Sequence, residues 1–273
     1  MQRLSKYFEG YYYKHQNEKD TLCIIVGHSE TEKFIQVITQ DDVWQVPYEK
    51  GNIFSKKGIR LQIKTPNLTM RGTIRYRELS PIRYDIMGPF RFFSMECCHG
   101  VISMRHRLEG KIQLNGKIFD FTDGIGYIEK DSGRSFPSDY TWVQANDFQE
   151  ACSIMAAVAV IPFCGLKFLG CICVIQYQEK EYRIATYLGG KAVVCTKNKM
   201  VLRQGKYTLD IEINSQNGQR LNAPQNGEMR RTILETASCP AEFRFYKRKE
   251  LIFHLHSEKT SFEYENMSLN LTR

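Results

Sequence analysis

Hydrophobic and polar residues alternate along most of the chain, in short runs that are separated by turn residues. Clear examples are QVITQDDVWQV (36–46), IRLQIKT (59–65), LTMRGTIRYRE (68–78) and CICVIQYQEKEYRIATY (171–187). A period of two places successive side chains on opposite faces of a strand. Because the runs are rich in β-branched and aromatic residues and follow one another closely, the chain is predicted to be all-β, with antiparallel barrels or sandwiches.

Turn residues mark where neighbouring strands reverse. Asn115-Gly116 in KIQLNGKIFDF and Gly189-Gly190 in ATYLGGKAVVC predict tight hairpins, and FRFYKRKELIFHLH is predicted to turn at its basic triplet. A short helical turn is expected only near residues 228–235. A chain of this length fills two barrels of about eight strands each better than one barrel. We therefore expect a first barrel over residues 1–134 and a second over residues 135–273.

The apolar stretch 151–175, ACSIMAAVAVIPFCGLKFLGCICVI, is long enough to suggest a membrane helix. Pro162, Gly165, Lys167 and Gly170 interrupt its middle, and the flanking runs are rich in residues that favour strands. The favoured interpretation is two buried strands joined by a turn.

Composition and charge narrow the functional classes. The chain has 273 residues, 42% of them hydrophobic, and a formal net charge of +8. The basic residues are dispersed, so specific nucleic-acid binding is not expected, whereas peripheral contact with an anionic membrane agrees with the charge. Nine cysteines and no apolar N-terminal segment of signal-peptide length favour reduced thiols and a cytoplasmic protein.

The segment GIGYIEKDSGRSFPSDYTWVQAN (124–146) concentrates candidate chemistry. On an extended strand, Tyr127, Glu129 and Asp131 share one face. The turn GRSFP keeps this acidic strand close to the strand that follows it.

That next strand carries rings and amides on one face, from Tyr140, Trp142, Gln144 and Asn146. Such a face suits a barrel lumen that holds a mostly apolar ligand and orients it with a few polar groups. An ordinary core, with its polar groups bonded to backbone, is the alternative.

The first strand repeats the pattern in FEGYYYKH, where Glu9, Tyr11 and Tyr13 share a face. They are expected either to line the first barrel, as ligand-binding residues, or to form the interface between the barrels.

The chain resembles the tocopherol cyclase family. The resemblance runs from near Tyr7 to near Tyr264 and is carried by FEGYYYKH, MECCHGVISMRHRLEG, GIGYIEKDSGRSFPSDYTWVQAN, ATYLGG and LNAPQNGEMRRTILE. The most specific element is GYxEKxxGxxFP followed by a WxQxN strand. Related barrel proteins include carotenoid hydratases. The resemblance implies two packed lipocalin-like barrels and a hydrophobic ligand such as an isoprenoid, a quinol or another lipid-like molecule.

The family chemistry is protonation of an isoprenoid alkene, followed by closure of a phenol oxygen onto the tertiary cation. Applied here, it implies Glu129 as the acid, with Asp131 as the alternative. A carboxyl group in a dry pocket has a raised pKa and can hold a proton for delivery. The rings would come from Tyr127, Tyr140 and Trp142, and the head group would be held by Gln144 and Asn146.

Three positions depart from the family pattern. Similar cyclases usually carry Trp where this chain has Ser132, Asn where it has Asp131, and Trp where it has Tyr11. These changes leave open a non-catalytic carrier or sensor that uses the same pocket. Because charged residues beside a turn are commonly structural, a salt-bridge cluster that fastens one barrel to the other is a further alternative for Glu129, Lys130, Asp131 and Arg134.

No cofactor or metal is expected. His254 and His256 lie two apart on a predicted strand, but no third ligand lies nearby in the sequence. The resemblance implies no particular oligomeric state.

Overall fold

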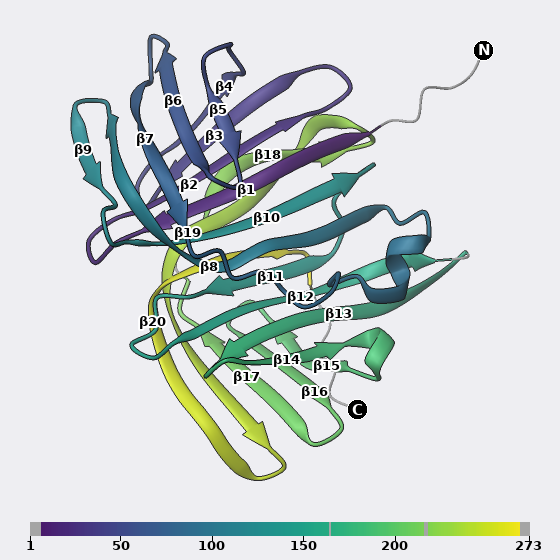
Figure 1. Ribbon diagram of the computed structural model, residues 1–273. Helices are drawn as coiled ribbons and strands as arrows, with labels where there is room; N and C mark the ends of the chain where they lie inside the picture. Colours follow the sequence, from purple (N-terminus) through teal and green to yellow (C-terminus); the bar gives the residue numbers. More distant parts are fainter. Residues whose placement is uncertain (1–6, 164, 216–217, 268–273) are drawn as a thin grey trace.

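Two antiparallel sheets of ten strands each make up the protein, and a computed structural model describes residues 7–163, 165–215 and 218–267 (Figure 1). The first sheet comprises β1 (Phe8–Gln16), β2 (Thr21–His28), β3 (Lys33–Thr39), β4 (Val43–Pro47), β5 (Ile53–Ser55), β6 (Gly58–Lys64), β7 (Thr69–Arg77), β8 (Cys97–Leu114), β9 (Lys117–Asp120) and β10 (Ile125–Gly133). The second comprises β11 (Tyr140–Ala145), β12 (Cys152–Phe163), β13 (Leu166–Tyr177), β14 (Lys180–Ala185), β15 (Lys191–Thr196), β16 (Lys199–Gln204), β17 (Tyr207–Ile213), β18 (Gln219–Gln225), β19 (Glu228–Lys247) and β20 (Glu250–Glu265). The all-β, two-barrel prediction is confirmed.

Each sheet curls around its own hydrophobic core because alternate residues of its strands point inward. In β6, Ile59, Leu61 and Ile63 are buried while Arg60 and Lys64 are exposed.

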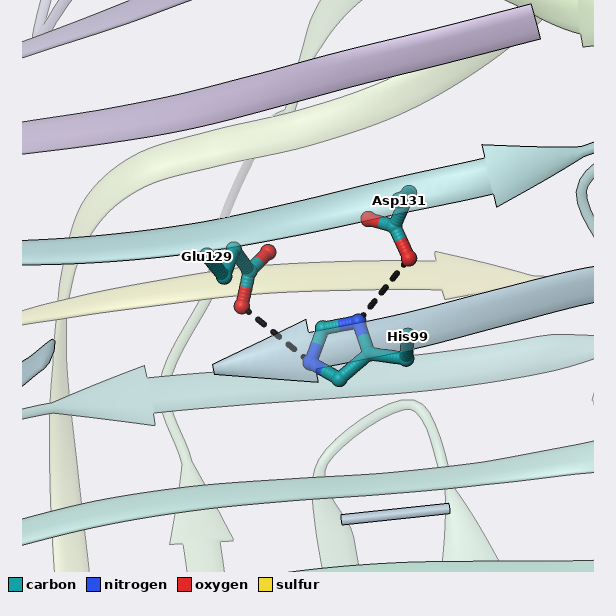
Figure 2. A group of neighbouring side chains, drawn as sticks. All are labelled: His99, Glu129 and Asp131. Carbon is teal, nitrogen blue, oxygen red and sulfur yellow. Dashed lines mark hydrogen bonds and ion pairs between the residues drawn. The ribbon is translucent and has the colours of Figure 1, made fainter. Parts of the chain in front are cut away.

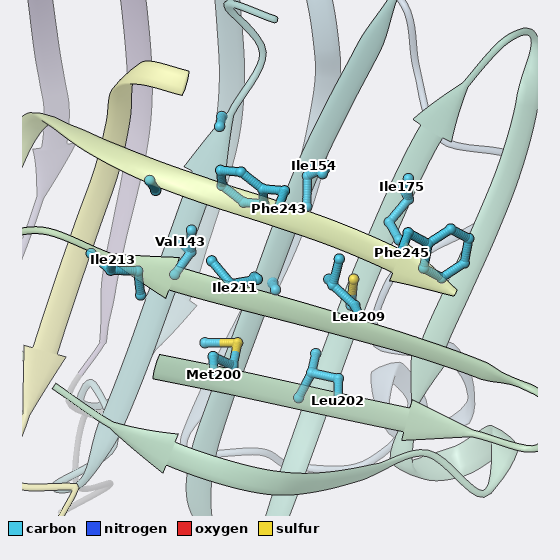
Figure 3. Close-up of a cluster of buried hydrophobic side chains, with 14 of the residues drawn as sticks. Val143, Ile154, Ile175, Met200, Leu202, Leu209, Ile211, Ile213, Phe243 and Phe245 are labelled. Carbon is cyan, nitrogen blue, oxygen red and sulfur yellow. The ribbon is translucent and has the colours of Figure 1, made fainter. Parts of the chain in front are cut away.

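The second core is equally dense. Figure 3 shows Val143, Ile154, Leu209 and Phe243 pointing into one space from four strands. Both barrel interiors are therefore packed with side chains rather than hollow along their length.

The two sheets have the same strand order except at one hairpin, where β9 follows its partner β8 but β18 precedes its partner β19. The first runs β4-β3-β2-β1-β10-β8-β7-β6-β5 and the second β14-β13-β12-β11-β20-β19-β17-β16-β15. β1 and β11 thus hold equivalent places, and residues 130 apart on them meet across the interface. Gln16 Nε2 donates to Asn146 Oδ1 at 2.7 Å, and Lys14 Nζ donates to Gln144 Oε1 at 3.0 Å. These contacts place an approximate twofold relation between the halves.

The predicted division between residues 134 and 135 falls in the connection from β10 to β11. These bounds of the two barrels stay a prediction.

Two predicted hairpins are confirmed. Asn115 and Gly116 join β8 to β9 with φ values of 47° and 87°, the left-handed region that this tight turn requires. β19 and β20 reverse at the basic triplet, where Arg248 has φ 59°.

The hairpin predicted at Gly189-Gly190 is wrong. The chain there makes the 3₁₀ turn η2 (Thr186–Leu188), which ends at Gly189, and β14 and β15 lie at opposite edges of the second sheet. The Gln204 side chain bridges to β14 instead, accepting from Ala185 N at 2.9 Å and donating to Arg183 O at 3.2 Å.

The helical turn expected near residues 228–235 is also wrong. Residues 228–235 form the start of the long strand β19 and pair with β18 in a hairpin. That hairpin reaches the first sheet, where Gln36 Nε2 donates to Asn222 O at 2.8 Å and Glu30 N donates to Gly227 O at 2.9 Å.

The apolar stretch 151–175 forms β12 and most of β13, paired antiparallel as predicted. Within the described ranges, no helix has the length and apolar character needed to cross a bilayer.

The interface between the barrels has its own buried core with a polar centre. Apolar side chains from both sheets pack there, including Met104, Trp142 and Met155. Among them Asn146 is almost fully buried, and its Nδ2 donates to Met104 O at 3.1 Å and to Gly126 O at 3.0 Å. Together with the bond from Gln16, these contacts fasten the second barrel to β8 and β10.

Replacing Asn146 with alanine is expected to destabilise the protein by about 2–4 kcal/mol, because it leaves buried polar groups without partners. Urea unfolding would measure the loss, with exposed Asn67→Ala expected to stay within about 0.5 kcal/mol of wild type. A loss below about 1 kcal/mol in Asn146→Ala would show that these bonds do not hold the interface.

Candidate functional site

The candidate site lies on the face of β10 that is turned towards the second barrel. Ile128 points into the first core, whereas Tyr127, Glu129 and Asp131 point to the interface. Tyr127 is fully buried, and its hydroxyl donates to Glu129 Oε2 at 2.6 Å. The three side chains therefore share a face, as their spacing predicts.

His99 from β8 lies between the two carboxyl groups, as Figure 2 shows. It is the direct cross-strand partner of Asp131, and its Nδ1 is 2.9 Å from Asp131 Oδ1. Its Nε2 is 3.4 Å from Glu129 Oε2, an ion-pair distance without hydrogen-bond geometry. One imidazole thus links both carboxyl groups.

The pKa values of Glu129 and His99 are both raised, so this cluster of His99, Glu129 and Asp131 holds protons at neutral pH. Burial raises the pKa of Glu129, the positive charge of His99 lowers it and Asp131 raises it, with a net value of about 7. Burial alone would lower the pKa of His99, but Asp131 and Glu129 raise it to about 9. At neutral pH, His99 is therefore charged and Glu129 is partly protonated.

The second barrel contributes another carboxyl group, that of the half-buried Glu263 on β20. Glu263 lies opposite Trp142 in the ladder, as Glu129 lies opposite Tyr12 in the first sheet. Tyr140 Oη donates to Glu263 Oε2 at 2.5 Å. Burial raises the pKa of Glu263 well above its ordinary range, and the nearby Glu129 charge raises it further. Each barrel thus presents a tyrosine-bonded glutamate to the interface.

These groups border a mostly apolar cavity of about 140 Å³ between the barrels. Its polar wall contains His99, Glu129, Asp131 and Glu263. The rest of the lining is largely apolar and aromatic, with Met87, Phe90, Met95, Phe136, Tyr140, Trp142, Ala157, Ala159, Ile161, Phe168, Ile172 and Tyr187. A second space of about 50 Å³ lies on the other side of Glu129, Asp131 and Glu263, towards β2 and β18. The carboxyl groups stand between the two spaces.

The long connection from β7 to β8, residues 78–96, roofs the cavity and contains the 3₁₀ turn η1 (Gly88–Phe92). Hydrogen bonds connect it to the second barrel. Ser80 Oγ donates to Gln176 Oε1 at 2.6 Å, and Tyr187 Oη donates to Ile86 O at 3.0 Å. The roof therefore joins both barrels.

The expectation that the pocket lies in a barrel lumen is wrong. Tyr140 and Trp142 point out of their barrel, while their neighbour Val143 fills its interior. Residues two apart share one face of a strand, but their spacing does not say whether that face points into the barrel or out of it. Tyr127 is not a wall of the cavity but lies behind Glu129 as a hydrogen-bond donor.

The remaining candidates lie elsewhere. Gln144 and Asn146 belong to the polar centre of the interface and do not line the cavity. Glu9, Tyr11 and Tyr13 lie on the face of β1 that points away from the interface. They line a separate open cleft of about 500 Å³ at the first barrel. The structure therefore does not bring these five residues to the Glu129 site.

The salt-bridge cluster considered from the sequence is divided between two faces. Lys130 points away from Glu129 and pairs with Glu9 at 2.8 Å. Glu129 and Asp131 pair with His99 instead. The charged residues of this segment do not form one junction.

Metal-binding capacity exists at one place in the described residues. His99, Glu129 and Asp131 offer ligand atoms that all lie within 4.8 Å of one another, close enough to hold a cation. His254 and His256 both contact the partly exposed Glu242 instead, with Nε2 and Nδ1 at 2.6 and 2.9 Å from its carboxylate oxygens.

Sequence reasoning missed His99 and Glu263. The signal for His99 was antiparallel pairing of MECCHGVIS with GYIEKDSG, which sets His99 opposite Asp131. Glu263 in SFEYEN has no comparable signal, because only the packing of the barrels brings it near Glu129.

Comparisons with known proteins agree with this architecture. Kievitone hydratase from Nectria haematococca has a TM-score of 0.57 at 12% identity, covering 97% of this chain and 91% of its own. A putative AttH protein from Nitrosomonas europaea has a TM-score of 0.52 at 11% identity, covering 93% of this chain and 91% of its own. At these identities the likeness establishes the fold alone.

A search of curated proteins finds no match to the sequence. The profile described as tocopherol cyclase-like matches residues 74–264, which include β8, β9, β10 and the second sheet except for its last residue, Glu265. Because this match covers more than half of the chain, the protein belongs to the tocopherol cyclase-like family.

Proposed function

We propose that the protein is an enzyme that protonates an alkene of an apolar, isoprenoid-like substrate held between the two barrels, with Glu129 as the acid. The observation that carries the proposal is a buried glutamate of raised pKa at the wall of an apolar cavity. A general acid works best when its pKa lies near the operating pH.

The chemistry begins with transfer of the Glu129 proton to one alkene carbon, which leaves a tertiary cation on the other. An oxygen of the substrate, or water, then bonds to that carbon and loses its proton to the cluster. His99 and Asp131 are placed to position Glu129 and to return this proton to it. The outcome is cyclisation or hydration, whereas loss of a neighbouring proton without capture gives isomerisation.

Aromatic side chains are placed to stabilise the cation. Tyr140 and Trp142 line the cavity beside Glu263, and a ring face near a desolvated cation contributes about 0.5–2 kcal/mol. The Glu129 carboxylate left after proton transfer supplies negative charge close by. Exclusion of water from the apolar walls protects the cation and strengthens these interactions.

The departure at position 132 does not remove a wall of this cavity. Ser132 alternates with Asp131 along β10 and is absent from the cavity lining. The Trp of similar cyclases would therefore extend from the other face of the strand, which weakens the argument for a non-catalytic carrier. Asp131, where cyclases have Asn, supplies the charge that pairs with His99.

Replacing Glu129 with glutamine should abolish turnover of a prenylated quinol or related alkene while ligand binding survives, because the amide keeps the shape and loses the proton. Rates and affinities of Glu129→Gln and of the exposed control Glu49→Gln are to be compared. Turnover that persists in Glu129→Gln would rule out Glu129 as the acid. Binding without turnover in wild type would support a carrier.

Turnover should fall as pH rises through about 7, because the protonated form of Glu129 is the acid and its pKa is about 7. His99→Gln removes the positive charge that lowers this pKa, so the midpoint of its remaining activity should move to higher pH. A pH–rate profile of both proteins measures the shift. A rate that increases through pH 7, or an unmoved midpoint, contradicts the assignment.

The purified protein should retain an apolar ligand, detectable by native mass spectrometry and identified after organic extraction. Ala157→Phe, which fills the cavity, should lose this ligand or bind an added prenylated quinol at least tenfold more weakly. Ser132→Trp adds a ring on the other face of β10 and should leave retention unchanged. Equal retention by Ala157→Phe would place the ligand elsewhere.

A further inference from the structure

Three exposed apolar side chains each lie within two residues of an aromatic ring that lines the interface cavity. Phe92 of η1 and Leu166 at the start of β13 are both 76% exposed, and Leu188 of η2 is 44% exposed. We call Phe92, Leu166 and Leu188 the apolar rim. Large exposed apolar groups that gather at one place on a protein mark an interaction surface.

The three elements of the rim meet at the cavity. The Phe90 ring lies 6.1 Å from that of Phe168 and 6.4 Å from that of Tyr187. All three of these rings line the cavity, and each lies within two residues of a rim residue. In Figure 1, η1 lies beside the start of β13, with η2 just below. The rim therefore lies beside the apolar lining of the cavity.

The charges beside the rim are positive. Arg91 is exposed and its guanidinium lies 4.5 Å from the centre of the Phe92 ring, and Lys167 is exposed next to Leu166. Glu96 is half-buried, which raises the pKa of its carboxyl group, and nearby positive charges that include Lys167 lower it. Long basic side chains beside exposed rings are typical of segments that enter the headgroup region of an anionic bilayer.

A bilayer fits this surface better than a protein partner does. The apolar groups stand on three separate turns rather than on one flat face, and lysine is depleted in protein–protein interfaces. An apolar ligand leaving a bilayer here would enter the cavity without crossing water.

We propose that the apolar rim, flanked by Arg91 and Lys167, docks the protein on an anionic phospholipid bilayer with the cavity facing the lipid. This docking is independent of the chemistry at Glu129, so it stands or falls separately from the proposed enzyme.

Sedimentation with vesicles tests the proposal. Wild type should bind vesicles of equal parts phosphatidylcholine and phosphatidylserine, and more weakly those of phosphatidylcholine alone. The double variant Phe92→Ser, Leu166→Ser should bind the mixed vesicles at least tenfold more weakly. Ile118→Ser is the matched control, because Ile118 is 62% exposed on β9, at the opposite side of Figure 1.

Absence of wild-type binding would overturn the proposal, and so would equal binding by the double variant. Binding that salt removes and the double variant retains would show adsorption by dispersed charge, which also overturns it.

A second measurement does not depend on removing apolar groups. Phe92→Trp should show blue-shifted emission with the mixed vesicles and quenching by brominated phosphatidylcholine, whereas Ile118→Trp should show neither. Identical responses of the two variants, or no response of Phe92→Trp, would contradict docking through the rim.

Discussion

The packing of one barrel against the other takes several carboxyl groups out of water, and the chemistry of the site depends on this desolvation. An ionised carboxylate in an apolar environment is costly unless it is paired or protonated. Glu129 and Glu263 each accept a hydrogen bond from a tyrosine, and burial is the first cause of the raised pKa of both. The same surfaces that bury these groups form the apolar walls of the cavity, so the proposed acid and the cavity arise from one interface.

The approximate twofold relation explains why this interface is chemically rich yet uneven. Both halves place a glutamate at the equivalent position, opposite Tyr12 in one sheet and opposite Trp142 in the other. Among the residues that the structure describes, only the first half adds a histidine beside it, since His99 of β8 pairs with Asp131. The larger of the two adjoining spaces is the one that His99 lines. The two halves therefore share a framework, and one of them carries the groups suited to proton transfer.

Much of the fold follows from local pattern, because alternation and turn residues define strands. The Asn115-Gly116 hairpin and the division of the 151–175 stretch are examples. The pattern also places Glu129 and Asp131 on one face of a strand. It cannot tell whether that face looks into a barrel or out of it, so the pocket was expected in the wrong place. His99 and Glu263 come from distant strands, and only strand pairing and barrel packing bring them to Glu129.

The central claim is that Glu129 holds a proton near neutral pH inside the interface. Infrared difference spectroscopy over a pH titration tests it most directly, because a protonated carboxyl has a carbonyl band that a carboxylate lacks. A band that disappears as pH rises through about 7, and that is missing in Glu129→Gln, is the predicted result. An unchanged band in Glu129→Gln, or no such band below pH 7, would show that Glu129 is ionised and would contradict its role as the acid.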